Sequence, residues 1–224
     1  MTEAAISLGT VKTTPTQDQS PAQLYLVGQE DFVIPVVFPD YLIHLNDGYE
    51  AVIFGRKITI PSQKAPYLGH AGVLIVNGKT GLTKYYEYGR YGPNGKTRSG
   101  LIPDVTLKGG MITESSLKKT LRAVSNNHGQ SGRIAGVVLR GQVFDQALAW
   151  LKAKEAENSD PTRQTYDLGD HNCMTFVADL VDHIELDSPF RPPVVIPSVY
   201  MKQFQLSNPD LEYDYASDTL EISD

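Results

Sequence analysis

Thiols, basic clusters and long apolar runs are scarce in this 224-residue sequence, and each scarcity excludes a class of protein. The single cysteine, Cys173, excludes an intramolecular disulfide and any site in which several thiolates of one chain bind zinc or an iron–sulfur cluster. No apolar run approaches the roughly 20 residues that cross a bilayer. A net charge of −6 without a Lys/Arg cluster argues against nucleic acid as a partner.

The composition, 41% hydrophobic and 21% charged, is typical of one globular domain. Residues 1–21 are rich in Thr, Ser, Gln and Pro and lack a basic stretch followed by an apolar one. We therefore expect a flexible N-terminal arm and no signal peptide. Residues 207–224 carry six acidic residues and are expected to form an acidic, weakly ordered tail. The folded unit is then predicted to span 22–206.

Short β-rich runs dominate the first half of this unit, whereas the second half has helical periodicity. Asn and Gly between two such runs, in Asn77–Gly81, predict a tight hairpin. Residues 89–110 contain many Gly and Pro and are expected to be irregular, and the prolines from Pro189 to Pro197 are expected to end regular structure. Strands are predicted at 23–27, 32–38, 50–54, 72–76, 83–88 and 134–140, and helices at 113–127, 143–157 and 173–184. This order indicates an α+β fold.

Cys173 lies at the predicted start of the last helix, which Asp170 or Asn172 can cap. A helix N-terminus presents unpaired N–H groups and the positive end of the helix dipole, both of which stabilise a thiolate. The backbone N–H of Cys173 would also face the oxygen of an attacked carbonyl, as one half of an oxyanion hole. The alternative is that Cys173 is a small buried apolar residue, the commonest fate of a free cysteine.

A cysteine nucleophile needs a base, and His70 is the best candidate among the five histidines of the chain. His183 lies ten residues along the same helix, about 15 Å away, and cannot reach the sulfur. His171 precedes the helix and is expected to point elsewhere, and His128 is expected at the surface of a helix end. His44 is a second choice. His70 opens the strand that enters the predicted hairpin.

The hairpin also supplies a partner for His70. If the turn is centred near Lys79, facing residues have numbers that sum to 157 or 158, so His70 lies opposite residue 87 or 88. Glu87 could then accept the second ring N–H of His70, fix its tautomer and stabilise the imidazolium. A one-residue slip would move Glu87 to the other face, and the alternative is a solvent-facing Glu on an edge strand.

With these residues in place, the chain resembles the papain-like NlpC/P60 superfamily in its circularly permuted form, in which the His strand precedes the Cys helix. The resemblance covers roughly residues 65–200. Its acidic composition without a signal peptide also resembles cell-wall-degrading effectors of type VI secretion. The matching stretches are Gly69-His70-Ala71-Gly72-Val73-Leu74, Tyr86-Glu87-Tyr88-Gly89 and Asn172-Cys173-Met174-Thr175-Phe176-Val177.

This resemblance implies a papain-like antiparallel sheet packed against helices, with Cys173 as nucleophile, His70 as base and Glu87 as orienting residue. It also implies hydrolysis of an amide bond in peptidoglycan stem peptides, without a metal or cofactor. The protein would be made in the cytoplasm and act in the periplasm of a target cell. A cognate immunity protein and a carrier in the secretion apparatus would be its partners.

Residues around the predicted cleft have two interpretations each. Tyr86, Tyr88 and Asn172 are candidates for substrate binding, although tyrosines at strand spacing are also typical of half-buried packing. Arg90 and Arg98 would pair with substrate carboxylates or stand as solvated loop charges.

Three further hypotheses compete with an amide hydrolase. One is a thiol acyltransferase or lipid hydrolase of the permuted group, which an apolar groove would favour. Another is a non-catalytic binding module in which Cys173 is buried and inert. A metal hydrolase fits poorly, because no HExxH motif is present and the histidines lack ligand spacing.

Overall fold

The computed structural model describes residues 30–46, 49–53, 56–60, 63–65, 68–92 and 94–223. The expected arm at 1–21 and strand at 23–27 lie outside them. The strands are β1 (Asp31–Phe38), β2 (Ile43–Asn46), β3 (Tyr49–Ile53), β4 (Arg56–Ile60), β5 (Gln63–Ala65), β6 (His70–Val76), β7 (Thr83–Gly89), β8 (Lys96–Gly100), β9 (Leu107–Lys108), β10 (Met111–Ile112), β11 (Ile134–Val137), β12 (Leu139–Gly141), β13 (Asp210–Asp214) and β14 (Thr219–Ser223). The helices are α1 (Glu114–His128), α2 (Phe144–Ala156), the 3₁₀ turn η1 (Glu157–Ser159), α3 (Cys173–His183) and α4 (Pro197–Gln205).

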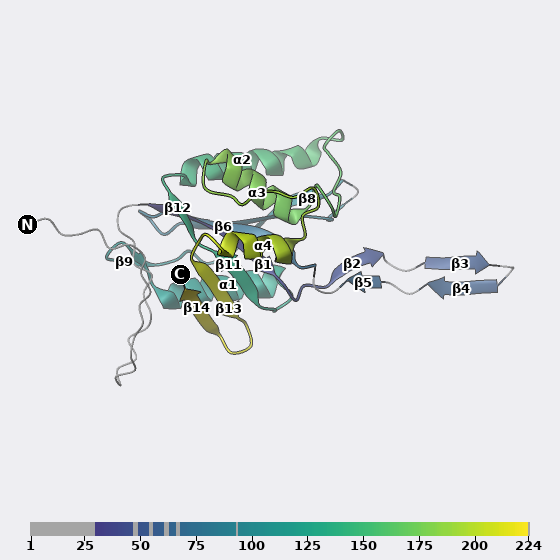
Figure 1. Cartoon of the computed structure of the whole chain (residues 1–224), viewed down its shortest axis with the longest axis horizontal. Helices are drawn as coiled ribbons and strands as arrows, with labels where there is room; N and C mark the ends of the chain where they lie inside the picture. The colour runs from purple at the N-terminus through teal and green to yellow at the C-terminus, as the bar shows by residue number, and fades with distance from the viewer. Residues whose placement is uncertain are drawn as a thin grey trace, which may run out of the picture.

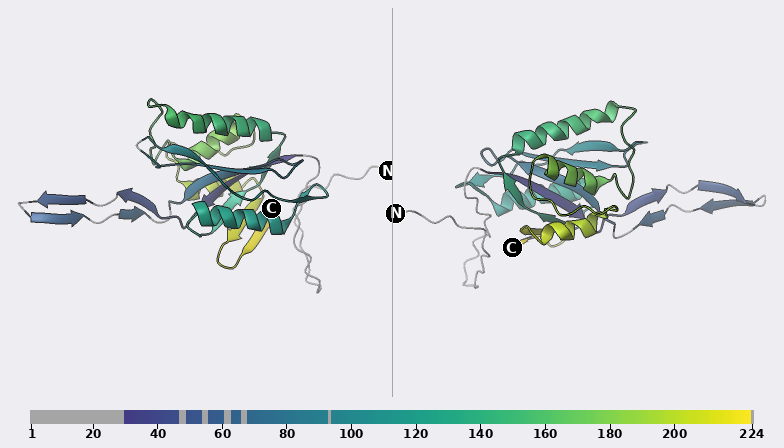
Figure 2. Two further views of the ribbon diagram at one scale, coloured as in Figure 1. Left: turned by 180° about the vertical axis from the view of Figure 1, so that it is seen from behind. Right: turned by 45° about the horizontal axis from the view of Figure 1, so that its top comes forward.

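Within the described residues, eight strands form one antiparallel sheet in the order β14-β13-β11-β1-β6-β7-β8, with β12 also paired to β1. Helices α2 and α3 lie over one face of this sheet and α1 lies over the other (Figure 1). The two further views in Figure 2 show the same layers. The predicted α+β single domain, an antiparallel sheet packed against helices, is confirmed.

The central strand β1 is apolar from Phe32 to Phe38 because helices cover both of its faces. Residues 32–38 are all buried, and they alternate between a core shared with α2, α3 and α4 and a core shared with α1. Pro35 has no N–H to donate, so it interrupts a sheet ladder. The pairing of β1 with β11 ends at Val36 and its pairing with β12 resumes at Val33, so Pro35 falls in the gap between them.

The predicted hairpin joins β6 to β7. The side chain of Asn77 accepts hydrogen bonds from the backbone N–H groups of Lys79 and Thr80 at 3.1 and 3.0 Å, and Gly81 takes a positive φ of 76°. The predicted register was wrong, because Gly72 rather than His70 lies opposite Glu87. The numbers of this pair sum to 159 instead of the expected 157 or 158. Gly72 and His70 are two residues apart and share one face of β6, so Glu87 lies on the same face of the sheet as His70.

Two strand pairs, β2–β5 and β3–β4, project from the sheet as a narrow extension in Figures 1 and 2. The predicted strand at 50–54 corresponds to β3. The extension leaves the domain between β1 and β6, the strand that carries His70.

The acidic segment 207–224 was expected to be a loose tail, and this prediction was wrong. Strand β13 pairs with β11, and β14 pairs with β13, so the segment extends the main sheet. Leu211 and Tyr213 are buried and alternate with acidic residues. This period of two is typical of a half-buried strand, and the charges alone concealed it.

Two other expectations about regular structure were also wrong. The stretch 89–110 contains strands β8 and β9. Helix α4 follows the prolines and begins at Pro197, where the missing N–H of proline costs nothing because the first N–H groups of a helix have no partner within the helix.

Candidate active site

Cys173 is the first residue of α3, and Asn172 fixes that helix start. The side-chain oxygen of Asn172 accepts hydrogen bonds from the N–H groups of Met174 and Thr175 at 2.9 and 3.2 Å. In return, the Thr175 hydroxyl accepts from the backbone N–H of Asn172 at 2.9 Å. This capping box satisfies the neighbouring donors and leaves the N–H of Cys173 available for another acceptor.

Asn172 was a candidate substrate-binding residue, but its side chain is fully occupied within the protein. Its amide nitrogen donates to the backbone oxygens of Leu168 and Val195 at 2.9 and 2.8 Å. The side chain therefore ties the segment before α3 to the segment before α4. These contacts fix the start of α3, where Cys173 lies.

His70 opens β6 directly after Gly69, whose positive φ of 76° turns the chain into the strand. The imidazole lies between the rings of Tyr41 and Phe38, with centroid distances of 5.0 and 6.2 Å. Its Nε2 is 3.1 Å from Oε2 of Glu87. The predicted contact between His70 and Glu87 is thus observed, as a diagonal pair across the hairpin.

The carboxylate of Glu87 is buried, and each of its oxygens has two polar contacts. Oε2 accepts from the hydroxyl of Tyr85 at 2.9 Å as well as contacting His70. Oε1 accepts from the hydroxyl of Tyr91 at 2.8 Å and lies 3.2 Å from Nδ1 of His128. A carboxylate with four such partners is held in one orientation and in its charged form.

The charges of this cluster reinforce one another. Burial lowers the pKa of His70, but the charge of the Cys173 sulfur, a hydrogen bond to that sulfur and the contact with Glu87 outweigh burial and raise the pKa to about 10. Burial likewise opposes ionisation of Glu87, but hydrogen bonds from His128 and His70 hold its pKa well below its ordinary value. The arrangement therefore favours an imidazolium between a carboxylate and the sulfur.

The charge of the Cys173 sulfur is the largest of the influences that raise the pKa of His70, so the lone thiol and the predicted base lie close together. Since Nε2 of His70 faces Glu87, the other ring nitrogen is the one left for the sulfur. Cys173 has no exposed surface and belongs to the core shared with α2, α3 and α4. Its polar neighbours are His70 and Tyr166, whose pKa values the sulfur raises.

Tyr166 and His128 were not foreseen as parts of this site. Burial and the charge of the Cys173 sulfur raise the pKa of Tyr166, so its hydroxyl keeps its proton. Tyr166 comes seven residues before the cysteine in an irregular segment, which gave no sign of its direction. His128 was expected at the surface of a helix end, but its side chain is only 14% exposed and turns to Glu87.

The candidate substrate residues Tyr86 and Tyr88 are buried on the opposite face of β7. The ring of Tyr88 packs 5.5 Å from that of Tyr166 and 5.2 Å from that of His171. Tyr88 therefore packs against the ring of Tyr166. The guanidinium of Arg98 lies 3.6 Å from the ring centre of Tyr91.

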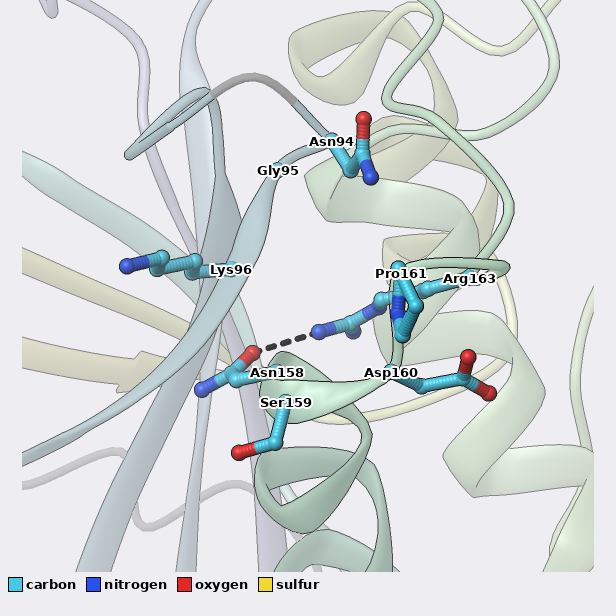
Figure 3. A pocket seen from close by; sticks show the side chains of 8 residues that line it. All are labelled: Asn94, Gly95, Lys96, Asn158, Ser159, Asp160, Pro161 and Arg163. Atoms are coloured by element: carbon cyan, nitrogen blue, oxygen red, sulfur yellow. Dashed lines mark hydrogen bonds between the residues drawn. The ribbon is translucent and has the colours of Figure 1, made fainter.

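A small apolar pocket of about 90 Å³ opens beside the cysteine. It is lined by Ile43, Leu68, Tyr166, Leu168, Asn172, Ile196 and Pro197. A larger pocket of about 160 Å³ lies elsewhere, between the loop before β8 and the segment after α2 (Figure 3). There Arg163 is turned to Asn158, to which it donates a hydrogen bond, so its charge is already engaged. The smaller pocket is the one whose lining includes Asn172 and Tyr166, the neighbours of Cys173.

The described part of the chain contains no cluster of three His, Cys, Asp or Glu side chains able to hold a metal ion. Among the same residues, no helix is both long and apolar enough to span a membrane.

Comparison with known proteins identifies the family. A sequence model described as type VI secretion system effector TseH-like matches residues 33–186. The chain belongs to the TseH-like family. The crystal structure of the type VI secretion system effector TseH is similar, with a TM-score of 0.77 and 49% sequence identity, over 88% of this chain and 100% of that chain. No match was found among curated proteins. The predicted resemblance to papain-like NlpC/P60 effectors of type VI secretion is thus confirmed, and the family concerned is the TseH-like one.

Proposed function

We propose that this TseH-like effector is a cysteine hydrolase that cleaves an amide bond. Cys173 is the nucleophile, His70 is the general base and acid, and Glu87 orients His70. The observation that carries the proposal is the continuous set of contacts from Glu87 through His70 to a sulfur at a helix N-terminus. An inert buried thiol would not need a charged, hydrogen-bonded imidazole as its neighbour.

In the first half of the reaction, His70 takes the proton of the Cys173 thiol. The sulfur attacks the carbonyl carbon and forms an S–C bond, and the intermediate then collapses with cleavage of the C–N bond. His70 gives the proton to the leaving amine. In the second half, water gives a proton to His70 and attacks the thioester carbon. The S–C bond breaks, the sulfur regains the proton, and a carboxylic acid leaves.

The oxyanion of each intermediate would face the N–H of Cys173 and the hydroxyl of Tyr166. The influence of the Cys173 sulfur on the Tyr166 hydroxyl supports this hydroxyl as the second donor of an oxyanion hole. Because Cys173 is fully buried, substrate binding requires movement of the residues that cover it.

The substrate we propose is peptidoglycan, cleaved within its stem peptides. Membership of a type VI effector family supports a target in a neighbouring cell, where the periplasm exposes this polymer. A producer of such an enzyme would need a cognate immunity protein, and delivery would require a carrier in the secretion apparatus. Arg90 is exposed and its charge influences the Tyr166 hydroxyl, which supports a role for Arg90 in binding a carboxylate of the stem peptide.

The apolar pocket beside Tyr166 favours a second candidate, a thiol acyltransferase or lipid hydrolase. Its lining is mostly aliphatic, which suits an acyl chain as well as a small amino-acid side chain. The first reaction half would be the same, with an ester or thioester in place of the amide.

Mass spectrometry of muropeptides tests the proposal directly. The wild-type protein should convert purified peptidoglycan to new products that differ from the substrate by hydrolysis of an amide, and Cys173→Ala should give none. Cys173→Ser is the matched control, with an oxygen in place of the sulfur and the same hydrogen-bonding geometry. Cleavage by Cys173→Ala would contradict the mechanism, and release of fatty acid from phospholipid instead of peptide cleavage would favour the second candidate.

A further inference from the structure

Glu87 connects His70 to a second imidazole, that of His128 at the last turn of α1. Nδ1 of His128 lies 3.2 Å from Oε1 of Glu87, and Nε2 of His70 lies 3.1 Å from Oε2. The two histidines therefore contact different oxygens of one carboxylate. They come from different elements, α1 and β6, and only the fold brings them together.

We propose that His128 is a positioning residue of the active site, whose Nδ1–H holds the carboxylate of Glu87 in the orientation that aligns His70 with Cys173. This inference rests on the proposed cysteine chemistry and extends it by one residue. His128 contacts neither the sulfur nor a substrate, so it acts through Glu87 alone.

The packing of the His128 ring supports a directed contact. Its ring centre is 4.6 Å from that of Tyr85, and a Cβ added at Gly100 would come within 2.4 Å of its Nε2. The ring is thus held between a tyrosine of β7 and the bare backbone of β8. A side chain with two rotatable bonds, confined in this way, points its Nδ1 at Glu87 without further loss of freedom.

Among the described residues, the titratable groups in contact with Glu87 come from several elements, and the charge of Glu87 also raises the pKa of Tyr41. His70 comes from β6, Tyr85 from β7, Tyr91 from the loop after β7, and His128 from α1. The charge of Arg98 on β8 reaches the cluster through the ring of Tyr91. Tyr91 and His128 both contact Oε1 of Glu87. Tyr91 also lies 3.3 Å from Nε2 of His70, so its removal would change His70 directly. Removal of His128 changes the contacts of Glu87 alone.

Two substitutions distinguish a hydrogen-bond donor at position 128 from a side chain that only fills space. His128→Asn places an N–H₂ group close to the position of Nδ1, whereas His128→Leu keeps an apolar side chain and removes the donor. Gly100→Ala, on the neighbouring strand, adds a Cβ that would lie 2.4 Å from Nε2 of His128 and 3.0 Å from the ring of Tyr85, so it displaces the His128 ring without altering its chemistry and also presses on Tyr85. This third variant tests the same contact if a substitution in α1 prevents folding.

The experiment measures the alkylation rate of Cys173 by iodoacetamide at pH 6 and pH 9, together with the downfield proton NMR signal of the His70 Nε2–H. We expect the pH 6 to pH 9 rate ratio to fall roughly tenfold in His128→Leu and in Gly100→Ala, and to stay within about threefold of wild type in His128→Asn, as for loss of one hydrogen bond to a charged group. The NMR signal should shift or broaden in the first two variants only.

A His128→Leu or Gly100→Ala protein with a native melting curve, an unchanged rate ratio and an unchanged His70 signal would overturn the inference. If the wild-type protein itself shows no more reactivity at pH 6 than an unfolded peptide thiol, the proposed cysteine chemistry fails, and the inference fails with it. These two failures are distinguished by the wild-type measurement alone.

Discussion

The two faces of β7 are built from similar residues and do different things. Tyr85 and Glu87 point to the side of α1, where their polar atoms join His70 in a buried hydrogen-bonded cluster. Tyr86 and Tyr88 point to the side of α3 and pack in its apolar core. One strand thus supplies the charged support of the base on one face and a scaffold for the nucleophile helix on the other.

The proposed catalytic pair lies where these two faces meet. His70 is the first residue of β6 and Cys173 is the first residue of α3, so both lie at an element end and neither has to cross the sheet. Because both faces of β7 carry tyrosines, polar contacts rather than residue type distinguish the face that supports His70. Substitutions on the two faces should therefore have different effects.

His70→Ala should have the largest effect, because it removes both the base and the charge beside the sulfur. We expect the rate of peptidoglycan hydrolysis to fall about a thousandfold or more. Release of soluble muropeptides over time measures this. His44→Ala is the matched control, since His44 was the second choice of base, and equal losses in the two variants would reassign the base.

Glu87→Gln should lower the hydrolysis rate by about a hundredfold or more, since an amide of the same shape no longer fixes the charge and tautomer of His70. The variant also replaces a buried carboxylate that has four polar partners, so thermal stability should fall. Glu221→Gln, exposed on β14, is a control for the loss of one negative charge. A Glu87→Gln enzyme with wild-type kinetics would remove Glu87 from the active site.

The pH dependence of stability should carry the signature of the His70–Glu87 pair. The pKa of Glu87 is lowered, so its stabilisation is present above the ordinary value of 4.5 and is lost as the pH falls. The pKa of His70 is raised from 6.5 to about 10, so its stabilisation is complete below pH 6.5 and is lost between pH 6.5 and about pH 10.

Urea denaturation of the wild type at several pH values should therefore show greatest stability near pH 5 to 6. The His70→Ala variant should lack the decline between pH 6.5 and 10. The same decline in both proteins would mean that other groups cause it.

Asn172→Ala should destabilise the protein by about 2 kcal/mol, since a helix cap and two buried hydrogen bonds are lost together. Asn172→Asp keeps the acceptor of the cap and removes the donors, so its loss should be smaller. Denaturant midpoints of the three proteins measure the difference. An Asn172→Ala protein that is fully stable but fails to bind substrate would restore the substrate-binding role.

The smallest expected effect separates the two faces of β7. Tyr85→Phe removes a 2.9 Å hydrogen bond to Glu87 and should slow hydrolysis severalfold, with about 1 kcal/mol of destabilisation. Tyr86→Phe, one residue along on the other face, should change the hydrolysis rate by less than about twofold. Equal effects of the two substitutions would show that the polar cluster is not what supports catalysis.

Local patterns in the sequence were enough to predict the elements that carry the site. The position of Cys173 at a helix start and of His70 at a strand start follow from capping residues and apolar periodicity, which act within a few residues. The His70–Glu87 contact was predictable because a hairpin pairs neighbours in sequence. The exact register of the hairpin was not predictable. The turn begins at Asn77 and pairs Glu87 with Gly72, whereas the expected partner was His70.

Long-range packing supplied what the sequence could not. His128 reaches Glu87 only because α1 crosses the face of β7, and Tyr166 reaches Cys173 from an irregular segment without periodicity. The strand formed by Asp210–Asp214 was missed because its acidic residues were interpreted as a charged tail rather than as the exposed half of an alternating strand.

The most direct test of the central claim compares iodoacetamide alkylation of Cys173 at pH 6 and pH 9 in the wild type and in His70→Ala. Burial of the sulfur slows alkylation at both pH values, so the ratio of the two rates is independent of how accessible the sulfur is. A paired sulfur should keep most of its pH 9 reactivity at pH 6 in the wild type and lose it when His70 is absent. Identical ratios in the two proteins would contradict the account.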